Sequence, residues 1–125
     1  MNIEDLRNHC IVKPGVTEEF PFDADTLVFK VMGKMFALAN VEDFVSVNLK
    51  CDPEKAIRLR EEFEDVLPGY HMNKKHWNTV HLSGDLPQGE IERMMDNSYT
   101  LVVKSLPKKI KQSLEIHYGA QAIYR

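Results

Sequence analysis

Residues 26–51 read TLVFKVMGKMFALANVEDFVSVNLKC, and this stretch decides the fold class. Apolar residues recur at every second position over much of it, which is the spacing of a strand with one buried face. Short breaks at Gly33-Lys34 and Glu42-Asp43 are typical of tight turns. The stretch therefore predicts three antiparallel strands, over residues 26–32, 35–40 and 44–51, with one solvated face.

The same spacing predicts which side chains of these strands lie together. Because side chains alternate across a strand, residues two apart share a face. The sets expected to share one face are Leu27, Phe29 and Val31 in the first strand, Phe36 and Leu38 in the second, and Val45, Val47 and Leu49, pointing inward, in the third.

Helices are expected before and after these strands. Asn2 is a suitable N-cap for a first helix that ends at Pro14-Gly15, and Asp52-Pro53 starts a second helix that runs to Leu67. Residues 16–25 between the first helix and the sheet are expected to form a loop. Its two aromatic residues, Phe20 and Phe22, are expected to pack under the first helix, because paired aromatics are more often packed than exposed.

A third helix is predicted over residues 86–106, with Asp85 and Gln88 spaced as a capping box. Pro107 ends it. Two short extended segments, 70–73 and 77–82, precede it, which gives the order α-β-β-β-α-β-β-α. This order predicts a two-layer α+β domain, an antiparallel sheet packed against helices, over residues 1–112, followed by a C-terminal tail at 113–125.

Composition sets limits on the class of protein. The chain has 125 residues, 43% of them hydrophobic and 28% charged, which suits one globular domain. It contains no apolar run of about 20 residues and no signal-peptide pattern at its start, so we expect a cytoplasmic protein and no membrane contact. The two cysteines, Cys10 and Cys51, are then expected to be free thiols.

The net charge of −3 does not favour nucleic-acid binding, but the charge is unevenly distributed. Residues 1–65 hold 8 Lys and Arg against 14 Asp and Glu, whereas residues 66–112 hold 7 against 4. Such an asymmetry can place a basic face on an acidic protein.

The segment 70–82, YHMNKKHWNTVHL, is the richest in residues that contact partners. Trp77 either closes one end of the sheet or offers a stacking platform for a base. Lys74 and Lys75 either contact phosphates or act as edge charges that discourage aggregation. His71, His76 and His81 recur at intervals of five, which alternates faces in extended chain, so they do not indicate a metal site.

No catalytic motif accompanies these residues. Ser83 lies near His81 and Asp85, but the tripeptide is a turn without a nucleophile elbow, and no glycine-rich phosphate loop is present. The sequence therefore predicts a protein that is not an enzyme and that needs no cofactor.

Four segments carry a resemblance to a known family. They are Pro14–Glu18, VFKVMGKMFAL at 28–38, GYHMNKKHWNTV at 69–80, and Ser98–Val102. Together they resemble the MmcQ/YjbR family of small bacterial proteins over about residues 1–112. The resemblance implies an α+β fold of the YjbR-like or CyaY-like type, and DNA binding through a "double wing".

Two functional hypotheses follow. In the first, a monomer binds double-stranded DNA through phosphate contacts that are sensitive to salt. Its contact residues are Lys74, Lys75, His76 and Trp77 in one wing, Lys30 and Lys34 in the other, and Lys108 and Lys109 with Lys104 and Lys111 beside them. In the second, the chain binds another protein or a small ligand through an aromatic face formed by Tyr70, His71 and Trp77. The hypotheses differ in geometry: the first needs the lysines on one surface, and the second needs a concave pocket near Trp77.

Overall fold

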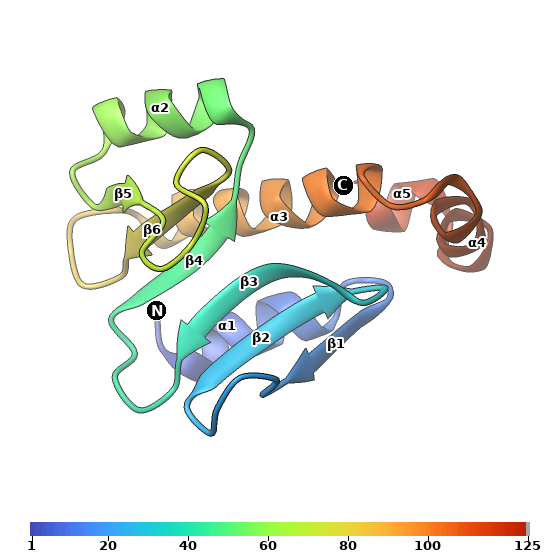
Figure 1. Cartoon of the computed structure of the whole chain (residues 1–125), viewed down its shortest axis with the longest axis horizontal. Coiled ribbons are helices and arrows are strands. Elements are labelled where there is room, and N and C mark those ends of the chain that lie inside the picture. The colour runs from blue at the N-terminus through green and yellow to red at the C-terminus, as the bar shows by residue number, and fades with distance from the viewer. Residues whose placement is uncertain (125) are drawn as a thin grey trace.

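Six strands form one antiparallel sheet in the order β1-β2-β3-β4-β6-β5 (Figure 1). The arrangement comes from a computed structural model, which describes residues 1–124. The strands are β1 Val16–Glu19, β2 Thr26–Val31, β3 Lys34–Asn40, β4 Ser46–Lys50, β5 Val66–Pro68 and β6 Trp77–His81.

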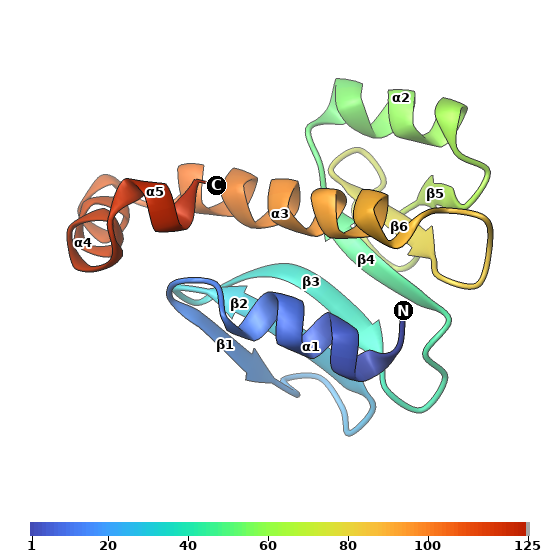
Figure 2. The same cartoon turned by 180° about the vertical axis from the view of Figure 1, so that it is seen from behind.

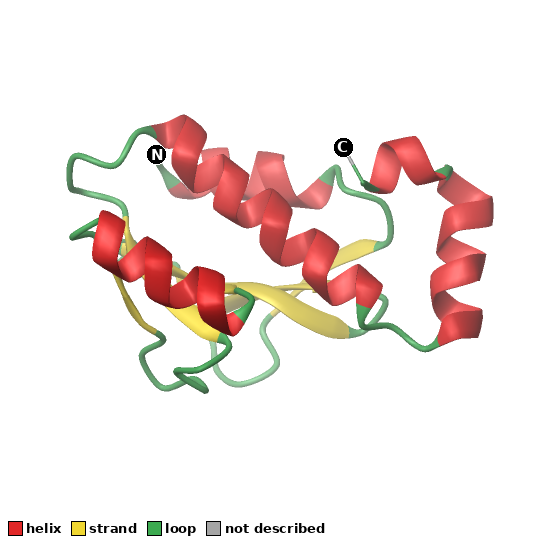
Figure 3. Ribbon diagram, turned by 90° about the horizontal axis from the view of Figure 1, so that it is seen from above, coloured by secondary structure: helices red, strands yellow, loops and turns green. Residues whose placement is uncertain are grey.

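Five helices accompany the sheet: α1 Ile3–Ile11, α2 Pro53–Glu62, α3 Gln88–Lys104, α4 Lys108–Tyr118 and α5 Ala120–Ile123. Helices α1 and α3 cover one face of the sheet, and α2 lies beside α3 (Figures 2 and 3). The opposite face carries loops alone (Figure 3). The predicted α+β class with helices packed on an antiparallel sheet is therefore confirmed, and one sheet face is left open.

Local capping explains where two helices begin. The side chain of Asn2 accepts a hydrogen bond from the backbone N–H of Asp5 at 2.8 Å, and the Asp5 carboxylate accepts one from the Asn2 N–H at 3.0 Å. Asp52 caps α2 in front of Pro53, as predicted. The capping box predicted for α3 is wrong, because Pro87 occupies the N-cap and Asp85 lies two residues before it, too early to cap the free N–H groups.

The main core lies between the sheet and the helices. Phe36 packs edge-on against Tyr99 with ring centroids 5.4 Å apart, and both side chains are fully buried. The Tyr99 hydroxyl donates to the Pro14 carbonyl oxygen at 2.6 Å, which ties α3 to the turn after α1. Burial raises the pKa of this phenol well above its ordinary value, so it stays protonated.

A β-bulge changes which side chains share a face. Phe29 pairs with Ala37 and Lys30 pairs with Met35, so Phe36 is an extra residue on β3. Phe36 and Ala37 therefore both belong to the main core, and Leu38 points to the open face with Val28. The predicted pairing of Phe36 with Leu38 on one face is wrong for this reason.

Other predictions in the strand region also need correction. The tight turn is Met32-Gly33, both with positive φ, rather than Gly33-Lys34. Val45 precedes β4 and is 44% exposed instead of pointing inward.

Two segments have a different structure from the predicted one. Residues 16–19 form edge strand β1, and Phe20 and Phe22 are 50% and 64% exposed instead of packing under α1. Helix α2 ends at Glu62, and Val66–Pro68 form β5, because pairing with β6 competes with helix extension. Residues 70–73 form turns rather than an extended segment.

Residues 108–118 and 120–123 are helical. Leu114 of α4 and Ile123 of α5 are both buried in the main core. The expected element order therefore lacked β1, β5, α4 and α5, and it included a strand at 70–73 that does not form.

Ser98 links the bulge to the neighbouring strand. Its fully buried hydroxyl donates to the Phe36 carbonyl oxygen at 2.6 Å and accepts from the Lys50 N–H at 2.9 Å. We expect Ser98→Ala to lower the free energy of unfolding by about 1–3 kcal/mol, because it leaves two backbone groups unpaired. Urea denaturation measures this. Ser105→Ala is the control, since Ser105 is exposed and its hydroxyl donates within its own helix end, to the Val102 carbonyl oxygen. Equal effects of the two changes would contradict the argument.

Candidate functional site

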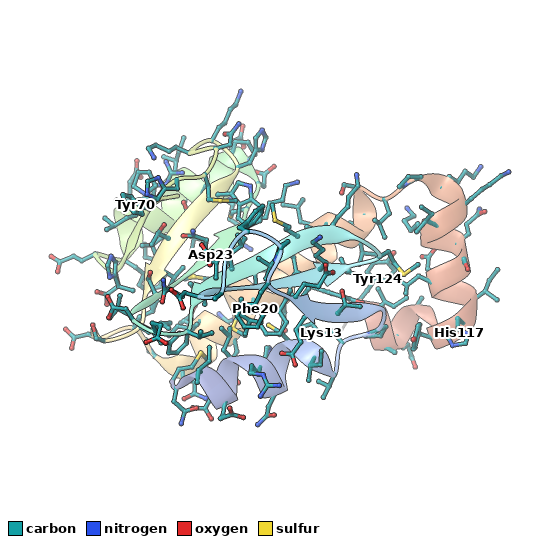
Figure 4. All side chains as sticks on the ribbon, turned by 60° about the horizontal axis from the view of Figure 1, so that its bottom comes forward. Lys13, Phe20, Asp23, Tyr70, His117 and Tyr124 are labelled. Carbon is teal, nitrogen blue, oxygen red and sulfur yellow. The ribbon has the colours of Figure 1, made fainter. Side chains whose placement is uncertain are left out.

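A groove of about 350 Å³ lies on the open face of the sheet. Its floor is formed by β3 and β4, and its two sides are the loop 20–25 and the loop 69–76. Figure 4 shows Phe20, Asp23 and Tyr70 on this side of the molecule. The lining residues are Phe22, Asp23, Thr26, Met35, Leu38, Ala39, Asn40, Ser46, Asn48, Tyr70, His71 and Met72.

Trp77 anchors the loop that forms one side of the groove. Its side chain is only 7% exposed and packs in a small cluster with Val28 and Leu38 on the open face, flanked by Met35 and Met72. Gly69 lies so close that a Cβ there would approach the Trp77 carbonyl oxygen to 2.9 Å. The loop is thus pressed against the sheet at this point.

Hydrogen bonds hold the same loop over β4 and β6. The Tyr70 N–H donates to Thr79 Oγ1 at 2.8 Å, and that hydroxyl donates to Asn48 Oδ1 at 2.5 Å. The Asn48 amide also donates to the Tyr70 carbonyl oxygen at 3.4 Å. Asn48 and Thr79 are directly paired across the strands, so the strand register sets the position of Tyr70.

Arg60 of α2 holds the far end of the loop. Its Nε donates to the Oδ1 of the buried Asn78 at 2.7 Å, and its guanidinium also donates to the Lys74 carbonyl oxygen. The Lys74 ammonium in turn donates to the Gly69 carbonyl oxygen at 3.0 Å. The loop is therefore fixed at both ends and in the middle, and the groove is preformed.

The two sides of the groove differ in chemistry. Tyr70 is 67% exposed and its ring lies 4.0 Å from that of His71, which has a positive φ of 60°. Opposite them, the Asp23 carboxylate accepts from the N–H groups of Asp25 and Thr26, and these bonds lower its pKa. One side of the groove thus presents the rings of Tyr70 and His71, and the other side holds the Asp23 carboxylate beside the exposed ring of Phe22.

The residues predicted for DNA contact occupy different environments. Trp77 is buried, so its ring closes the sheet end and offers no platform for stacking. Lys30 pairs with Glu19 at 3.4 Å, and Lys74 is bound within its own loop. Lys75 is exposed and His76 is partly buried.

The remaining predicted lysines lie at another part of the molecule. Lys34 is the first residue after the β2–β3 turn. This turn lies near α4, as shown by the side chains of Met32 in the turn and Leu114 in α4, which both lie close to Gly15. Lys108 and Lys109 are exposed in the first turn of α4. The loop 69–76 lies instead beside α2 (Figures 1 and 2), so the proposed wings do not form one surface. Tyr70 and His71, by contrast, are brought together at the groove.

A second cavity of about 470 Å³ lies between α1, α3 and the C-terminal helices. The Lys13 ammonium donates to Asp96 Oδ1 at 2.5 Å, and His9 Nε2 lies 2.8 Å from the same oxygen. Burial raises the pKa of Asp96, but the hydrogen bonds from Lys13 and His9 outweigh it and lower the pKa overall. The cluster joins α1 to α3.

This cluster gives a pH-dependent prediction. A carboxylate whose pKa is lowered by folding stabilises the protein above its ordinary pKa, and the contribution is lost as the pH falls through the lowered value. We expect Asp96→Asn to lower the free energy of unfolding at pH 7 by at most about 1 kcal/mol, because the side chain is 43% exposed. The difference from the unchanged protein should begin to shrink near pH 4, the ordinary range of an Asp carboxyl, and should disappear only once the pH falls below the lowered pKa. Urea denaturation at pH 7 and pH 3 measures this, and a difference that grows on acidification would contradict it.

Two features of residues 1–124 bear on function. No cluster of three or more His, Cys, Asp or Glu side chains is arranged to hold a metal ion in this part of the chain. None of the helices described is both long and apolar enough to cross a membrane. Cys10 and Cys51 are both buried free thiols, and burial raises the pKa of Cys10 to about 12.

The fold and the groove define a small α+β domain with an open sheet face and a preformed binding groove. The chain belongs to the YjbR family, whose sequence model, described as YjbR, matches residues 12–101. It is 38% identical over 115 residues to the uncharacterized protein YjbR of Escherichia coli (strain K12), covering 91% of this chain and 98% of that protein. It is 31% identical over 113 residues to the uncharacterized protein YyaQ of Bacillus subtilis (strain 168), covering 78% and 95%.

Solved structures agree with this assignment. A crystal structure of a Deinococcus radiodurans protein, described by the domain DUF419, matches with a TM-score of 0.84 and 40% identity, covering 90% of this chain and 87% of that one. A crystal structure of a Pseudomonas syringae protein matches with a TM-score of 0.69 and 30% identity, covering 81% and 98%. The family resemblance inferred from sequence is confirmed.

Sequence reasoning missed part of the groove. Phe22, Asp23 and Asn48 line it but were not among the predicted site residues. The pair of phenylalanines around Pro21 was a usable signal, but it was interpreted as core packing. No sequence signal places Asn48 opposite Thr79, because that requires the strand register.

Proposed function

We propose that this protein is a non-catalytic binding module whose site is the groove on the open sheet face. The observation that carries the proposal is the preformed loop 69–76, which holds the exposed Tyr70 ring against a concave surface. Exposed aromatic side chains beside a concave apolar floor are typical of recognition sites. The many bonds that fix this loop reduce the entropy that binding must overcome.

Nuclear magnetic resonance tests this proposal directly. We expect a panel of small aromatic and peptide fragments to shift amide signals of Met35, Asn48 and residues 70–72. Tyr70→Ala should abolish these shifts without unfolding the protein, because the ring is largely exposed. Shifts that gather at the α1–α3 cavity, or none at all, would contradict the proposal. Ile57→Ala is a matched control, since Ile57 is exposed on α2 away from the groove.

DNA binding is the second candidate, and one observation favours it. Lys34 and the lysines at the α3–α4 junction, Lys104, Lys108 and Lys109, are exposed near the same end of the molecule. Such a cluster can contact phosphates, and contacts of this kind weaken steeply with salt.

Fluorescence anisotropy with a labelled duplex separates the two candidates. DNA binding should appear at ~50 mM salt, fall strongly by ~200 mM, and disappear in Lys108→Glu/Lys109→Glu. The pair Lys74→Glu/Lys75→Glu tests the loop 69–76 as a wing in the same assay. Absence of binding at low salt would overturn this candidate and leave the groove proposal unaffected.

A further inference from the structure

We propose that the groove binds an arginine side chain presented by an extended segment of a partner protein. The proposal rests on the function proposed above and names the chemistry of its ligand. Charge, the aromatic groups and the extent of the surface each support it.

The charge of the groove favours a cation. Within the described residues, Asp23 is the only lining side chain with a fixed charge, and no lysine or arginine lines the groove. The carboxylates of Asp25, Glu42 and Asp43 are exposed in the adjacent loops and add to the negative potential. With Asp23 they outnumber the two lysines of the loop 69–76, Lys74 and Lys75. A negative concave surface attracts cations and repels phosphates, so this site does not suit a nucleic acid.

The Asp23 carboxylate can accept a further donor. Its Oδ1 accepts the N–H groups of Asp25 at 2.9 Å and Thr26 at 2.7 Å, whereas its Oδ2 accepts the Thr26 hydroxyl alone at 3.1 Å. Each carboxylate oxygen has room for about two hydrogen bonds, so Oδ2 has capacity for an N–H of a ligand. The turn also fixes the position of the carboxylate before the ligand arrives.

Exposed aromatic groups favour arginine among the cations. Tyr70 and Phe22 line the groove and are 67% and 64% exposed, so their ring faces are open to a ligand. A guanidinium is planar, stacks on aromatic faces and donates to carboxylates at the same time. The ammonium group of lysine also donates to carboxylates, but it is not planar and cannot stack on an aromatic face.

The extent of the surface favours a peptide over a free small cation. Beyond the groove, Phe20 is 50% exposed in the same loop as Phe22. The floor of the groove also presents Met35, which is partly exposed at the edge of the Trp77 cluster. A single guanidinium group would leave these apolar side chains uncovered, whereas flanking apolar residues of a peptide would bury them.

The test uses two peptides that differ in one group. The ¹⁵N-labelled full chain is titrated with acetyl-Leu-Arg-Leu-amide and with the same peptide carrying citrulline, which has the shape of arginine without its charge. We expect the arginine peptide to shift amide signals of Asp23, Thr26, Asn48 and Tyr70 and to bind about five- to tenfold more tightly than the citrulline peptide. Equal binding of both peptides overturns the cation inference and leaves the groove function standing. Absence of binding by either peptide, while aromatic fragments still bind, overturns the inference alone, and absence of both contradicts both proposals.

Variants identify the groups responsible. Asp23→Asn keeps an oxygen acceptor for the two backbone N–H groups, so the turn is retained and the arginine preference should fall to nearly equal binding. Tyr70→Ala should weaken both peptides, because it removes the stacking surface. Glu61→Gln, an exposed acid on α2, is the charge-matched control and should change neither affinity. An arginine preference that survives Asp23→Asn overturns the assignment of the carboxylate.

Discussion

Replacing Trp77 by alanine is expected to lower the free energy of unfolding by about 3–5 kcal/mol and to eliminate ligand binding at the groove. The side chain is almost fully buried against Val28 and Leu38, so its removal leaves a cavity on the open face. The loop 69–76 packs on this cluster through Gly69 and Met72 and loses that support. Chemical denaturation followed by circular dichroism measures the stability, because the only tryptophan has been removed.

Hydrogen exchange shows whether the loop loses order as well. The N–H groups of His76 and Trp77 both donate to the Asn73 carbonyl oxygen, and the Gly69 N–H donates to Trp77. These amides should exchange much faster in Trp77→Ala. Amides of α3 should exchange faster only to the extent that the free energy of global unfolding falls. Trp77→Phe should restore most of the protection. A stability loss below about 1 kcal/mol would show that Trp77 is a surface platform rather than an anchor.

The sequence predicted the class of the fold and most of the central strands. Alternation identified the segments that became β2, β3, β4 and β6, and the caps at Asn2 and Asp52 marked two helix starts. These features depend on local chemistry, which a sequence displays directly. The edge strand β1 was missed because three of its four residues are polar and its one strand partner within the described residues is β2.

The faces of β3 were predictable only up to the bulge. An alternating pattern assigns Phe36 and Leu38 to one side, whereas the extra residue places Ala37 on the same face as Phe36 and Leu38 on the opposite face. No turn residue or glycine marks the bulge, which is retained because Phe36 fits against Tyr99 and its carbonyl oxygen accepts from Ser98. The contacts of Phe36 with α3 therefore determine the local backbone geometry of β3.

The sequence indicated some of the residues of the candidate site but not how the fold brings them together. The segment 70–82 was predicted to be the richest in contact residues; its Tyr70 and His71 line the groove, whereas its Trp77 is buried. The loop 20–25, which supplies the opposite side, lies 45 or more residues away in sequence and comes close only because β2, β3 and β4 are adjacent. Tertiary contacts also determine which lysines are engaged within the protein: Lys30 pairs with Glu19, and Lys74 donates to the Gly69 carbonyl oxygen.

Phe36→Ala should be the most damaging single change in the main core, lowering the free energy of unfolding by about 3–5 kcal/mol. The ring contacts Phe29 at a centroid distance of 6.4 Å and Tyr99 at 5.4 Å, and it is fully buried at the bulge. Its loss removes the packing that keeps β3 bulged, so the register of β3 against β2 should loosen and hydrogen exchange at Ala37 and Leu38 should rise. Phe22→Ala is the matched control, since it removes the same ring from an exposed position and should change stability by less than about 0.5 kcal/mol. Because Phe22 lines the groove, that control should instead weaken ligand binding, and the two phenylalanines would then separate the folding of the sheet from recognition on its open face.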